Sequence, residues 1–280
     1  MVIVIVLCSV FGAIAIGGTA YFFYRVILNL RPEAQSMIRC RTKDDAAGMQ
    51  GCTEVITGKQ TSNRDKIYAY DRRSVIHINR KEFDAAIDDA TQAIRLDQNH
   101  AVSYYNRALS YERKEMYDAA LQDLNTSLRL NPKYGPAFFA RGNVYQQKED
   151  YPHAISDYDE AIRINPKDGF PWIFRGSTRA AVGDLQGALA DCNKGLLLRP
   201  DDANAFDCRA FTYLRMKNYA QALPDYNAAI KRLPAVYGWL YCRGLTKRGL
   251  GDVAGAKADI TIATTRAPGI ENRYKRFHLE

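Results

Sequence analysis

Apolar residues follow two different patterns along the chain. Residues 2–24 form an uninterrupted run without a charged side chain. From residue 67 onward, apolar residues instead recur at helical spacing, in paired blocks divided by a short polar turn such as Lys148-Glu149-Asp150. The first pattern is typical of a membrane-spanning helix, and the second predicts a series of helical hairpins.

The apolar run predicts an uncleaved membrane anchor over residues 1–30. Its 23 residues would reach about 34 Å as a helix, against about 30 Å for the hydrocarbon core of a bilayer. A cleaved signal peptide is the alternative, because Gly18-Thr19-Ala20 offers small residues at a cleavage site. No Lys or Arg precedes the run, and the residues after Ala20 stay apolar, which favours the anchor.

Four series of residues repeat with a period of 34 between residues 73 and 268, and they define six repeats over residues 67–266. The series are arginines (Arg73, Arg107, Arg141, Arg175, Arg209, Arg243), aspartates (Asp89, Asp123, Asp157, Asp191, Asp225, Asp259), alanines (Ala86, Ala120, Ala154, Ala188, Ala222, Ala256) and prolines (Pro132, Pro166, Pro200, Pro234, Pro268). They predict six hairpins, five of them closed by a proline that cannot continue the second helix, with Gln98 in place of proline in the first copy. Pro224 lies inside a predicted helix and is expected to kink it.

Two copies show the repeat most fully. The third carries Phe138, Arg141, Gly142, Tyr145, Ala154, Tyr158 and Pro166, and the fourth carries Trp172, Arg175, Gly176, Arg179, Ala188, Cys192 and Pro200. This pattern resembles the 34-residue signature of the tetratricopeptide repeat family. The resemblance implies an all-α fold, a right-handed superhelix of stacked hairpins, here preceded by one transmembrane helix. It also implies a non-enzymatic scaffold that binds a protein or an extended peptide in a concave groove.

One departure from the family pattern is systematic, because the family's usual Leu is Arg in every copy. Each arginine precedes an aspartate by 16 residues, which predicts six structural ion pairs: Arg73–Asp89, Arg107–Asp123, Arg141–Asp157, Arg175–Asp191, Arg209–Asp225 and Arg243–Asp259. A basic stripe that binds an anionic ligand is the alternative. The acidic series recurs as strictly as the basic one, which favours the ion pairs.

Residues 31–66 predict a degenerate leading hairpin, offset by 38 rather than 34 residues from the next copy. A disulfide between Cys40 and Cys52 would close a short loop and stabilise this hairpin, and two buried thiols are the alternative. No histidine or second cysteine pair lies nearby, so no metal site is expected. A leading cysteine hairpin before such repeats resembles exported bacterial tetratricopeptide proteins, which implies an envelope location.

The flanking charges and the cysteines disagree about the compartment. The basic residues that follow the apolar run would keep the repeats in the cytoplasm; they are Arg25, Arg31, Arg39, Arg41 and Lys43. A disulfide favours an oxidising compartment. We expect a periplasmic repeat array, with a cytosol-facing receptor anchored in an organellar or inner membrane as the alternative. Cys192, Cys208 and Cys242 are expected as small core residues; Cys192 and Cys208 lie on successive predicted helices and could approach each other, but the sequence does not determine whether they form a bond.

The partner-binding groove is predicted on the first helix of each hairpin. Positions at i, i+4 and i+7 spacing form an apolar floor with scattered polar groups: Tyr105, Leu109, Glu112, Phe139, Asn143, Gln146, Ile173, Ser177, Phe211, Leu214, Tyr241 and Arg248. The alternative for each residue is packing between helices. After the last hairpin, residues 267–280 predict a capping helix with Ile270, Tyr274 and Phe277 on one apolar face.

The net charge and the absence of catalytic sequence motifs limit the possible functions further. The net charge is +8, and a membrane anchor argues against a nucleic-acid partner. Four histidines lie on different predicted elements, and the chain has no metalloprotease, phosphate-loop, serine-hydrolase or dinucleotide motif. We therefore expect no enzymatic activity, no cofactor, no metal and no small-molecule substrate. The partners expected are a protein or extended peptide in the groove and a membrane at the N-terminal helix.

Overall fold

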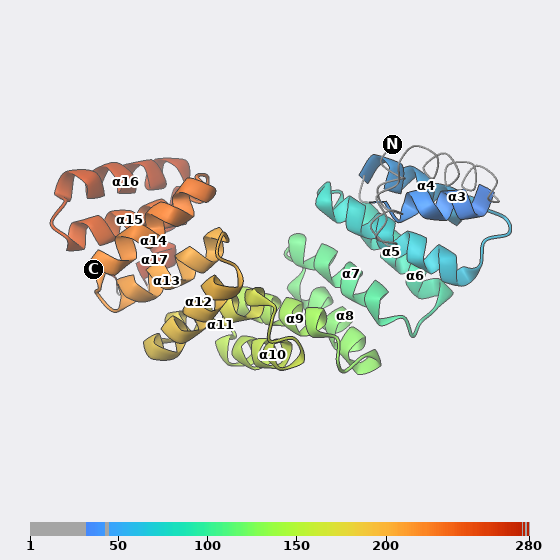
Figure 1. Cartoon of the computed structure of the whole chain (residues 1–280), viewed down its shortest axis with the longest axis horizontal. Coiled ribbons are helices and arrows are strands. Elements are labelled where there is room, and N and C mark those ends of the chain that lie inside the picture. Colours follow the sequence, from blue (N-terminus) through green and yellow to red (C-terminus); the bar gives the residue numbers. More distant parts are fainter. Residues whose placement is uncertain (1–31, 43–44, 276, 278, 280) are drawn as a thin grey trace, which may run out of the picture. The chain divides into compact units, whose positions relative to one another are not determined.

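The computed structural model describes residues 32–42, 45–275, 277 and 279. These residues form fifteen helices, and no strand is found among them (Figure 1). The all-α prediction is therefore confirmed for this part of the chain. The predicted anchor lies outside the described residues, and none of the helices within them is long and apolar enough to cross a membrane.

Consecutive helices pair into hairpins. The leading hairpin is α3 (Pro32–Cys40) and α4 (Asp45–Thr57). Six repeats follow: α5 (Asn63–Asn79) with α6 (Phe83–Leu96), α7 (Ala101–Arg113) with α8 (Tyr117–Leu130), α9 (Gly135–Gln147) with α10 (Tyr151–Ile164), α11 (Gly169–Val182) with α12 (Leu185–Leu198), α13 (Ala203–Arg215) with α14 (Tyr219–Arg232), and α15 (Tyr237–Gly249) with α16 (Val253–Arg266). The described residues divide into two compact units, those up to residue 132 and those from residue 133 onward.

The turn between the two helices of every repeat contains one residue in the left-handed region. Glycine fills this position twice, as Gly183 and Gly251, with φ of 95° and 85°. The other four copies place a charged residue there, with φ between 59° and 62°: Lys81, Glu115, Glu149 and Lys217. This backbone conformation is unfavourable for residues with a Cβ, so the tight turn is imposed by the packing of the hairpin.

Small residues let the two helices of a repeat approach closely. The first helix contributes a buried small residue at one position in all six copies: Ser74, Ala108, Gly142, Gly176, Ala210 and Gly244. The second helix contributes the repeated alanines, which are all buried. Larger buried side chains then fill the remaining space, and Tyr158 and Tyr226 are the largest that are fully buried among the described residues.

Pro224 does not end the helix that contains it. Helix α14 continues through Pro224, and its length of 14 residues equals that of α10, α12 and α16. Packing against the neighbouring helices therefore outweighs the loss of one backbone hydrogen bond.

The C-terminal segment forms a helix of only six residues, α17 (Ile270–Lys275), where residues 267–280 were expected to cap the array. It contacts α15 and α16, as a cap of the last hairpin would. Its aromatic residues also reach back to α13, where Phe211 contacts both Tyr274 and Phe277. The segment therefore occupies part of the face that was predicted to bind a partner.

Candidate functional site

Every repeated arginine forms a forked ion pair with the aspartate 16 residues later. In the first unit, Arg73 Nε lies 2.7 Å from Asp89 Oδ2 and Arg73 Nη2 lies 2.6 Å from Asp89 Oδ1. The same two bonds recur, at 2.7 to 2.8 Å, in Arg107–Asp123, Arg141–Asp157, Arg175–Asp191, Arg209–Asp225 and Arg243–Asp259. The aspartates are buried and the arginine side chains are mostly buried.

The remaining nitrogen of the fork reaches the second helix of the preceding hairpin. Arg107 Nη1 donates to Thr91 at 3.1 Å, Arg209 Nη1 to Asn193 at 3.2 Å, and Arg243 Nη1 to Asn227 at 3.0 Å. Each of these partners lies 16 residues before its arginine. Arg73 instead reaches Thr53, 20 residues back, because the leading hairpin carries an insertion of four residues.

These contacts weaken the alternative of an anion-binding stripe. Hydrogen bonds to the aspartates raise the pKa of Arg73, Arg107, Arg141 and Arg209. The forks of these side chains are directed at carboxylates and at neighbouring helices. A free anion would have to replace a buried bidentate partner, which is unfavourable.

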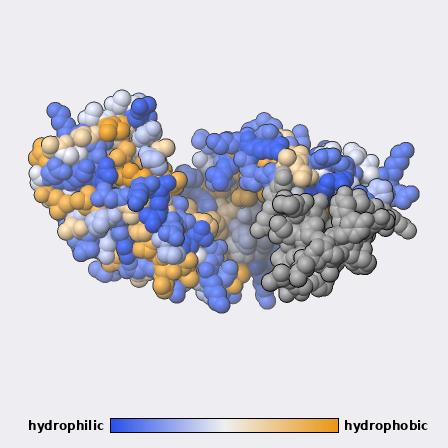
Figure 2. Space-filling model, turned by 45° about the horizontal axis from the view of Figure 1, so that its top comes forward, coloured by the Kyte–Doolittle hydropathy of each residue, from blue (hydrophilic) through white to orange (hydrophobic). Residues whose placement is uncertain are grey.

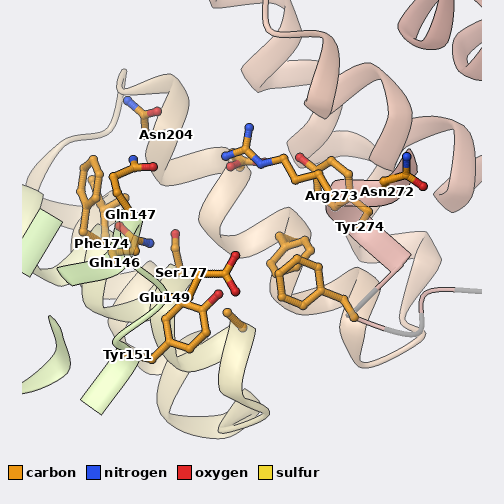
Figure 3. A pocket seen from close by; sticks show the side chains of 15 residues that line it. Gln146, Gln147, Glu149, Tyr151, Phe174, Ser177, Asn204, Asn272, Arg273 and Tyr274 are labelled. Atoms are coloured by element: carbon orange, nitrogen blue, oxygen red, sulfur yellow. The ribbon is translucent and has the colours of Figure 1, made fainter. Parts of the chain in front are cut away.

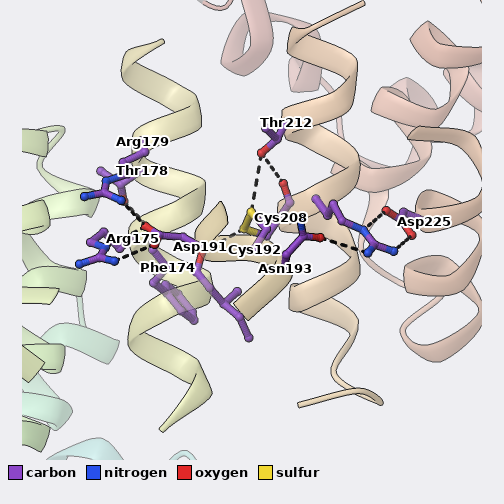
Figure 4. Close-up of a disulfide and its surroundings, with 12 residues drawn as sticks. Phe174, Arg175, Thr178, Arg179, Asp191, Cys192, Asn193, Cys208, Thr212 and Asp225 are labelled. Carbon is purple, nitrogen blue, oxygen red and sulfur yellow. Dashed lines mark hydrogen bonds and ion pairs between the residues drawn. A yellow bond between two sulfur atoms is a disulfide. The ribbon is translucent and has the colours of Figure 1, made fainter. Parts of the chain in front are cut away.

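Two disulfides connect helices in the described part of the chain. Cys40 and Cys52 join the two helices of the leading hairpin, with Cα atoms 4.5 Å apart. Cys192 and Cys208 form a second bond that the sequence did not lead us to expect, with Cα atoms 5.6 Å apart (Figure 4). This bond joins α12 to α13 and so ties consecutive repeats together. The sequence feature that could have indicated this bond is the spacing of 16 residues between the two cysteines, because the same spacing brings Asn193 into contact with Arg209.

Gly176 makes the second disulfide possible. A Cβ atom at this position would lie 2.9 Å from each of the two sulfur atoms, closer than real contacts allow. The third thiol of this region, Cys242, is buried and is the free cysteine among the described residues.

A cavity of about 610 Å³ lies entirely within the second unit. Four of the predicted groove residues line it: Gln146, Ile173, Ser177 and Phe211. The prediction missed further lining residues on α9 to α13 and in the C-terminal segment, including Gln147, Glu149, Tyr151, Phe174, Asn204 and Arg273 (Figure 3). The structure therefore brings four of the predicted groove residues together around one cavity, and the sequence did not predict the contribution of the C-terminal segment.

Amides and aromatic rings are organised on one side of this cavity. The Tyr158 hydroxyl lies 2.9 Å from Asn143 Oδ1 and 3.1 Å from Gln146 Oε1, so it can donate to either amide. Phe139 packs edge-on against Phe174, with ring centroids 5.2 Å apart. Asn143 and Phe139 therefore support the cavity wall from behind, while Gln146 and Phe174 line it.

Several predicted groove residues are also largely buried. Ile173 is 1% exposed, Leu214 is 2% exposed and Tyr241 is 8% exposed. Ile173 reaches the cavity but also fills the space left by Gly195. Arg248 is exposed and is not a lining residue. The spacing i, i+4, i+7 marks one face of a helix without showing what covers that face, so packing between helices was the alternative for each of these residues.

The first unit contributes three predicted groove residues, Tyr105, Leu109 and Glu112. All three are half-buried on α7 and do not line the cavity of the second unit. Burial raises the pKa of Glu112, and burial together with the charge of Glu112 raises the pKa of Tyr105.

Tyr105 and Ile173 occupy the same position in the first helix of their repeats. Two of the six repeats have an aspartate at this position, Asp71 and Asp207. Asp71 accepts a hydrogen bond from Ser103 Oγ at 2.8 Å and lies 3.2 Å from His100 Nδ1. Asp207 receives a hydrogen bond from Trp239, which is the residue equivalent to Ser103 four repeats later. Burial raises the pKa of Asp207 to about 7, although Trp239 and the nearby charge of Arg273 oppose the shift.

The cluster of Asp71, His100 and Ser103 does not have the geometry of a catalytic triad. His100 uses the same nitrogen, Nδ1, toward Asp71 and toward Ser103, which lies 2.9 Å from it. A proton relay needs the serine and the aspartate on opposite nitrogens of the imidazole. The cluster therefore serves to satisfy a buried carboxylate.

Exposed apolar side chains do not define a second site. Larger ones in the second unit include Val182, Leu197, Leu233, Leu250, Val253 and Ile262. In the space-filling view apolar and polar residues are interspersed (Figure 2). Scattered exposed apolar residues are ordinary on soluble domains.

The repeated two-helix unit, the 34-residue period and the small-residue contact define a helical-repeat protein. Models of the tetratricopeptide repeat match residues 67–100, 101–134 and 136–168. These residues therefore carry tetratricopeptide repeats, as their sequence pattern indicated. Proteins built from such arrays generally act as non-enzymatic scaffolds that bind other proteins.

Solved structures with the same fold have low sequence identity. A tetratricopeptide repeat protein from Parabacteroides merdae is 20% identical, with a TM-score of 0.63 over 91% of this chain and 98% of that chain. Pseudomonas aeruginosa pilF is 14% identical, with a TM-score of 0.64 over 76% and 98%. A chain of the APC/C hetero-tetramer Cut9–Hcn1 is 12% identical, with a TM-score of 0.66 over 91% of this chain and 60% of that chain. These likenesses show the fold alone, and no curated protein sequence matches the chain.

Proposed function

We propose that this chain is a non-enzymatic, membrane-tethered scaffold that binds a protein segment or extended peptide in the cavity of its second unit. The observation that carries the proposal is the convergence of side chains from α9, α11 and α13 on one cavity of about 610 Å³. This volume lies within the range of about 300–1,000 Å³ that is usual for binding sites. It suits a few residues of a partner chain.

The lining chemistry suits a peptide. Gln146, Gln147 and Asn204 carry carboxamides, which can both donate to and accept from a peptide backbone. Phe174 and Phe211 offer apolar surface to a partner's side chains. The lining residues do not include a comparable set of groups for acyl transfer, phosphate binding or metal binding.

Site-specific photocrosslinking tests the binding site. A photoreactive amino acid replaces Ser177, which lines the cavity, and in a matched control it replaces Gln186, which is exposed on α12. We expect one protein to be captured from native membranes through position 177 and not through position 186. The same protein should be lost when Gln146→Ala and Phe174→Ala are added. Equal capture at both positions would contradict the proposed site.

Membrane tethering and location rest on separate support. The apolar run of residues 2–24 supports a tether, and the two disulfides support an oxidising compartment such as the bacterial periplasm. A reporter enzyme that is active only after export, fused after Glu280, tests the topology. Activity supports the periplasmic array, whereas an inactive but expressed fusion supports the cytosol-facing receptor that the flanking charges favour.

A further inference from the structure

The C-terminal segment already occupies one end of the predicted groove. Tyr274 stacks on Tyr241, with ring centroids 5.5 Å apart and planes inclined by 26°. Phe277 packs edge-on against Phe211 at 5.2 Å, and the guanidinium of Arg215 lies 5.6 Å from the Phe277 ring centroid. Tyr241 and Phe211 are both predicted groove residues. The segment thus makes, within one chain, the contacts that a partner was expected to make.

The hydroxyl group of Tyr274 packs against Gly238, where the absence of a Cβ atom leaves room for it. At Gly238 on α15, an added Cβ would lie 2.6 Å from Tyr274 Oη but 3.5 Å from the nearest ring carbon. Glycine at this position is therefore matched to tyrosine, whereas phenylalanine would not need it.

Charge complements the aromatic contacts. Arg273 precedes Tyr274 and lies close enough to Asp207 to stabilise its carboxylate. Both residues line the cavity, so an acidic group of α13 faces a basic group of the segment. The local pattern that the site accepts is a basic residue, a tyrosine directly after it and a phenylalanine three residues later.

The segment is held by few contacts. Helix α17 has six residues and none of them is buried. A helix of this length is not stable on its own in water. It follows α16 after three residues, Ala267–Gly269, with Gly269 at a φ of +83°. A short helix on a short connection, docked by two aromatic rings, is suited to exchange with a competing segment.

We propose that the face of α13 and α15 around Phe211, Tyr241 and Gly238 binds partner segments with the pattern Arg-Tyr-x-x-Phe, and that the chain's own C-terminal segment is its resident occupant. A partner segment of this chemistry displaces α17 and gains access to the adjoining cavity. The inference rests on the proposed function and names the chemistry of the partner.

A labelled peptide with the sequence of residues 267–280 tests the proposal by fluorescence anisotropy. The full chain carrying Tyr274→Ala and Phe277→Ala has an emptied site, and we expect it to bind the peptide at least tenfold more tightly than the unaltered chain. The unaltered chain competes with its own tethered segment at high effective concentration. A peptide with the same two alanines should not bind. Equal affinity of both proteins, or of both peptides, would overturn the proposal.

The contact between Gly238 and Tyr274 gives a second test that does not depend on removing the segment. Adding Gly238→Ala to the emptied chain should weaken binding of the tyrosine peptide at least tenfold. A peptide with phenylalanine in place of this tyrosine should restore the affinity, because its ring lacks the atom that meets the new methyl group. Failure of this rescue would show that Gly238 acts only on folding and would overturn the match of this glycine to tyrosine.

Two further outcomes separate this inference from its alternatives. If the unaltered chain is a dimer by light scattering and Tyr274→Ala with Phe277→Ala makes it monomeric, the segment sits in a second copy, which overturns the intramolecular assignment. If no peptide binds while crosslinking through position 177 still captures one protein, the proposed function stands and this inference fails.

Discussion

Arg175 donates from Nε and Nη2 to the two carboxylate oxygens of Asp191, at 2.8 and 2.7 Å. Its Nη1 atom reaches Asp159 of the preceding repeat at 2.5 Å. One guanidinium thus connects three helices, and equivalent contacts recur in the repeats of Arg107, Arg209 and Arg243. A hydrophobic residue at this position would only fill space, whereas the planar fork also sets how one hairpin is placed on the next.

Breaking one ion pair is expected to destabilise the array strongly. Asp225 is buried, and its carboxylate accepts both bonds from Arg209. Arg209→Met or Asp225→Leu alone should lower the free energy of unfolding by about 3 kcal/mol, because each leaves an unpaired charge. The double variant should lose less than the sum of the two. Urea denaturation followed by circular dichroism measures these values.

The contact of Arg209 with the preceding repeat provides the control. Asn193 accepts from Arg209 Nη1 at 3.2 Å near the surface, so Asn193→Ala should cost about 1 kcal/mol or less. Strict additivity of Arg209→Met and Asp225→Leu would show that the two residues are not energetically coupled.

Two glycines three residues apart on α4 should respond oppositely to alanine. At Gly51 a Cβ would lie 2.4 Å from the backbone nitrogen of Cys40 and 2.7 Å from the carbonyl oxygen of Ser36, neither of which can move freely. Gly51→Ala should therefore cost about 2–3 kcal/mol and slow formation of the Cys40–Cys52 bond. At Gly48 the nearest atom is the terminal carbon of Ile76 at 3.3 Å, so Gly48→Ala should be neutral or stabilising.

Unfolding free energies and the rate of thiol loss during oxidative refolding measure both effects. Equal destabilisation by the two substitutions would mean that α3 and α4 do not approach as closely as Gly51 requires.

The disulfides should be countable and individually removable. Two bonds among six cysteines leave two thiols to react with an alkylating agent in denatured, unreduced protein, and six after reduction. Cys192→Ala with Cys208→Ala should lower the free energy of unfolding by about 3 kcal/mol, the contribution of closing a loop of this size. Adding reductant should then change the melting temperature less than in the unaltered chain. Six reactive thiols in unreduced protein would contradict both bonds.

Stability should depend on pH through His100. Its hydrogen bond to Asp71 raises the pKa of His100 in the folded chain. The protonated imidazole therefore stabilises the fold fully below the pKa of a free histidine, about 6.5, and this contribution is lost as the pH rises through the higher folded pKa. The free energy of unfolding, measured between pH 5 and 9, should fall over that window. The fall should be smaller in both Asp71→Asn and His100→Gln, and an unchanged profile in both would assign it to other groups.

Sequence periodicity was sufficient for features that repeat. The partners of Arg175 and Arg209 follow from a constant spacing, because every copy places its arginine and aspartate on the same two faces of a hairpin. The C-terminal segment has no such copy to be compared with, so its amphipathic pattern predicted a helix but not the docking of Tyr274 on Tyr241. Leu214 is buried and does not line the cavity, whereas Ser177 lines it, and helical spacing cannot distinguish these two environments.

The left-handed conformation of the turn residue also could not be predicted from the sequence, because lysine or glutamate occupies this position in four of the six repeats. Lys217 has a φ of 59° and is exposed, so it carries the cost of this conformation without an evident contact that requires its side chain. Lys217→Gly removes a conformational penalty of about 1–2 kcal/mol, of which the greater freedom of glycine in the unfolded chain offsets about 0.5–1 kcal/mol. We expect a net gain of about 0.5 kcal/mol in the free energy of unfolding. Asn218 is the matched control, because it is the next residue, is also exposed and has a φ of -88°. Asn218→Gly should therefore give no gain, and a gain of the same size at both positions would mean that the tight turn does not strain Lys217.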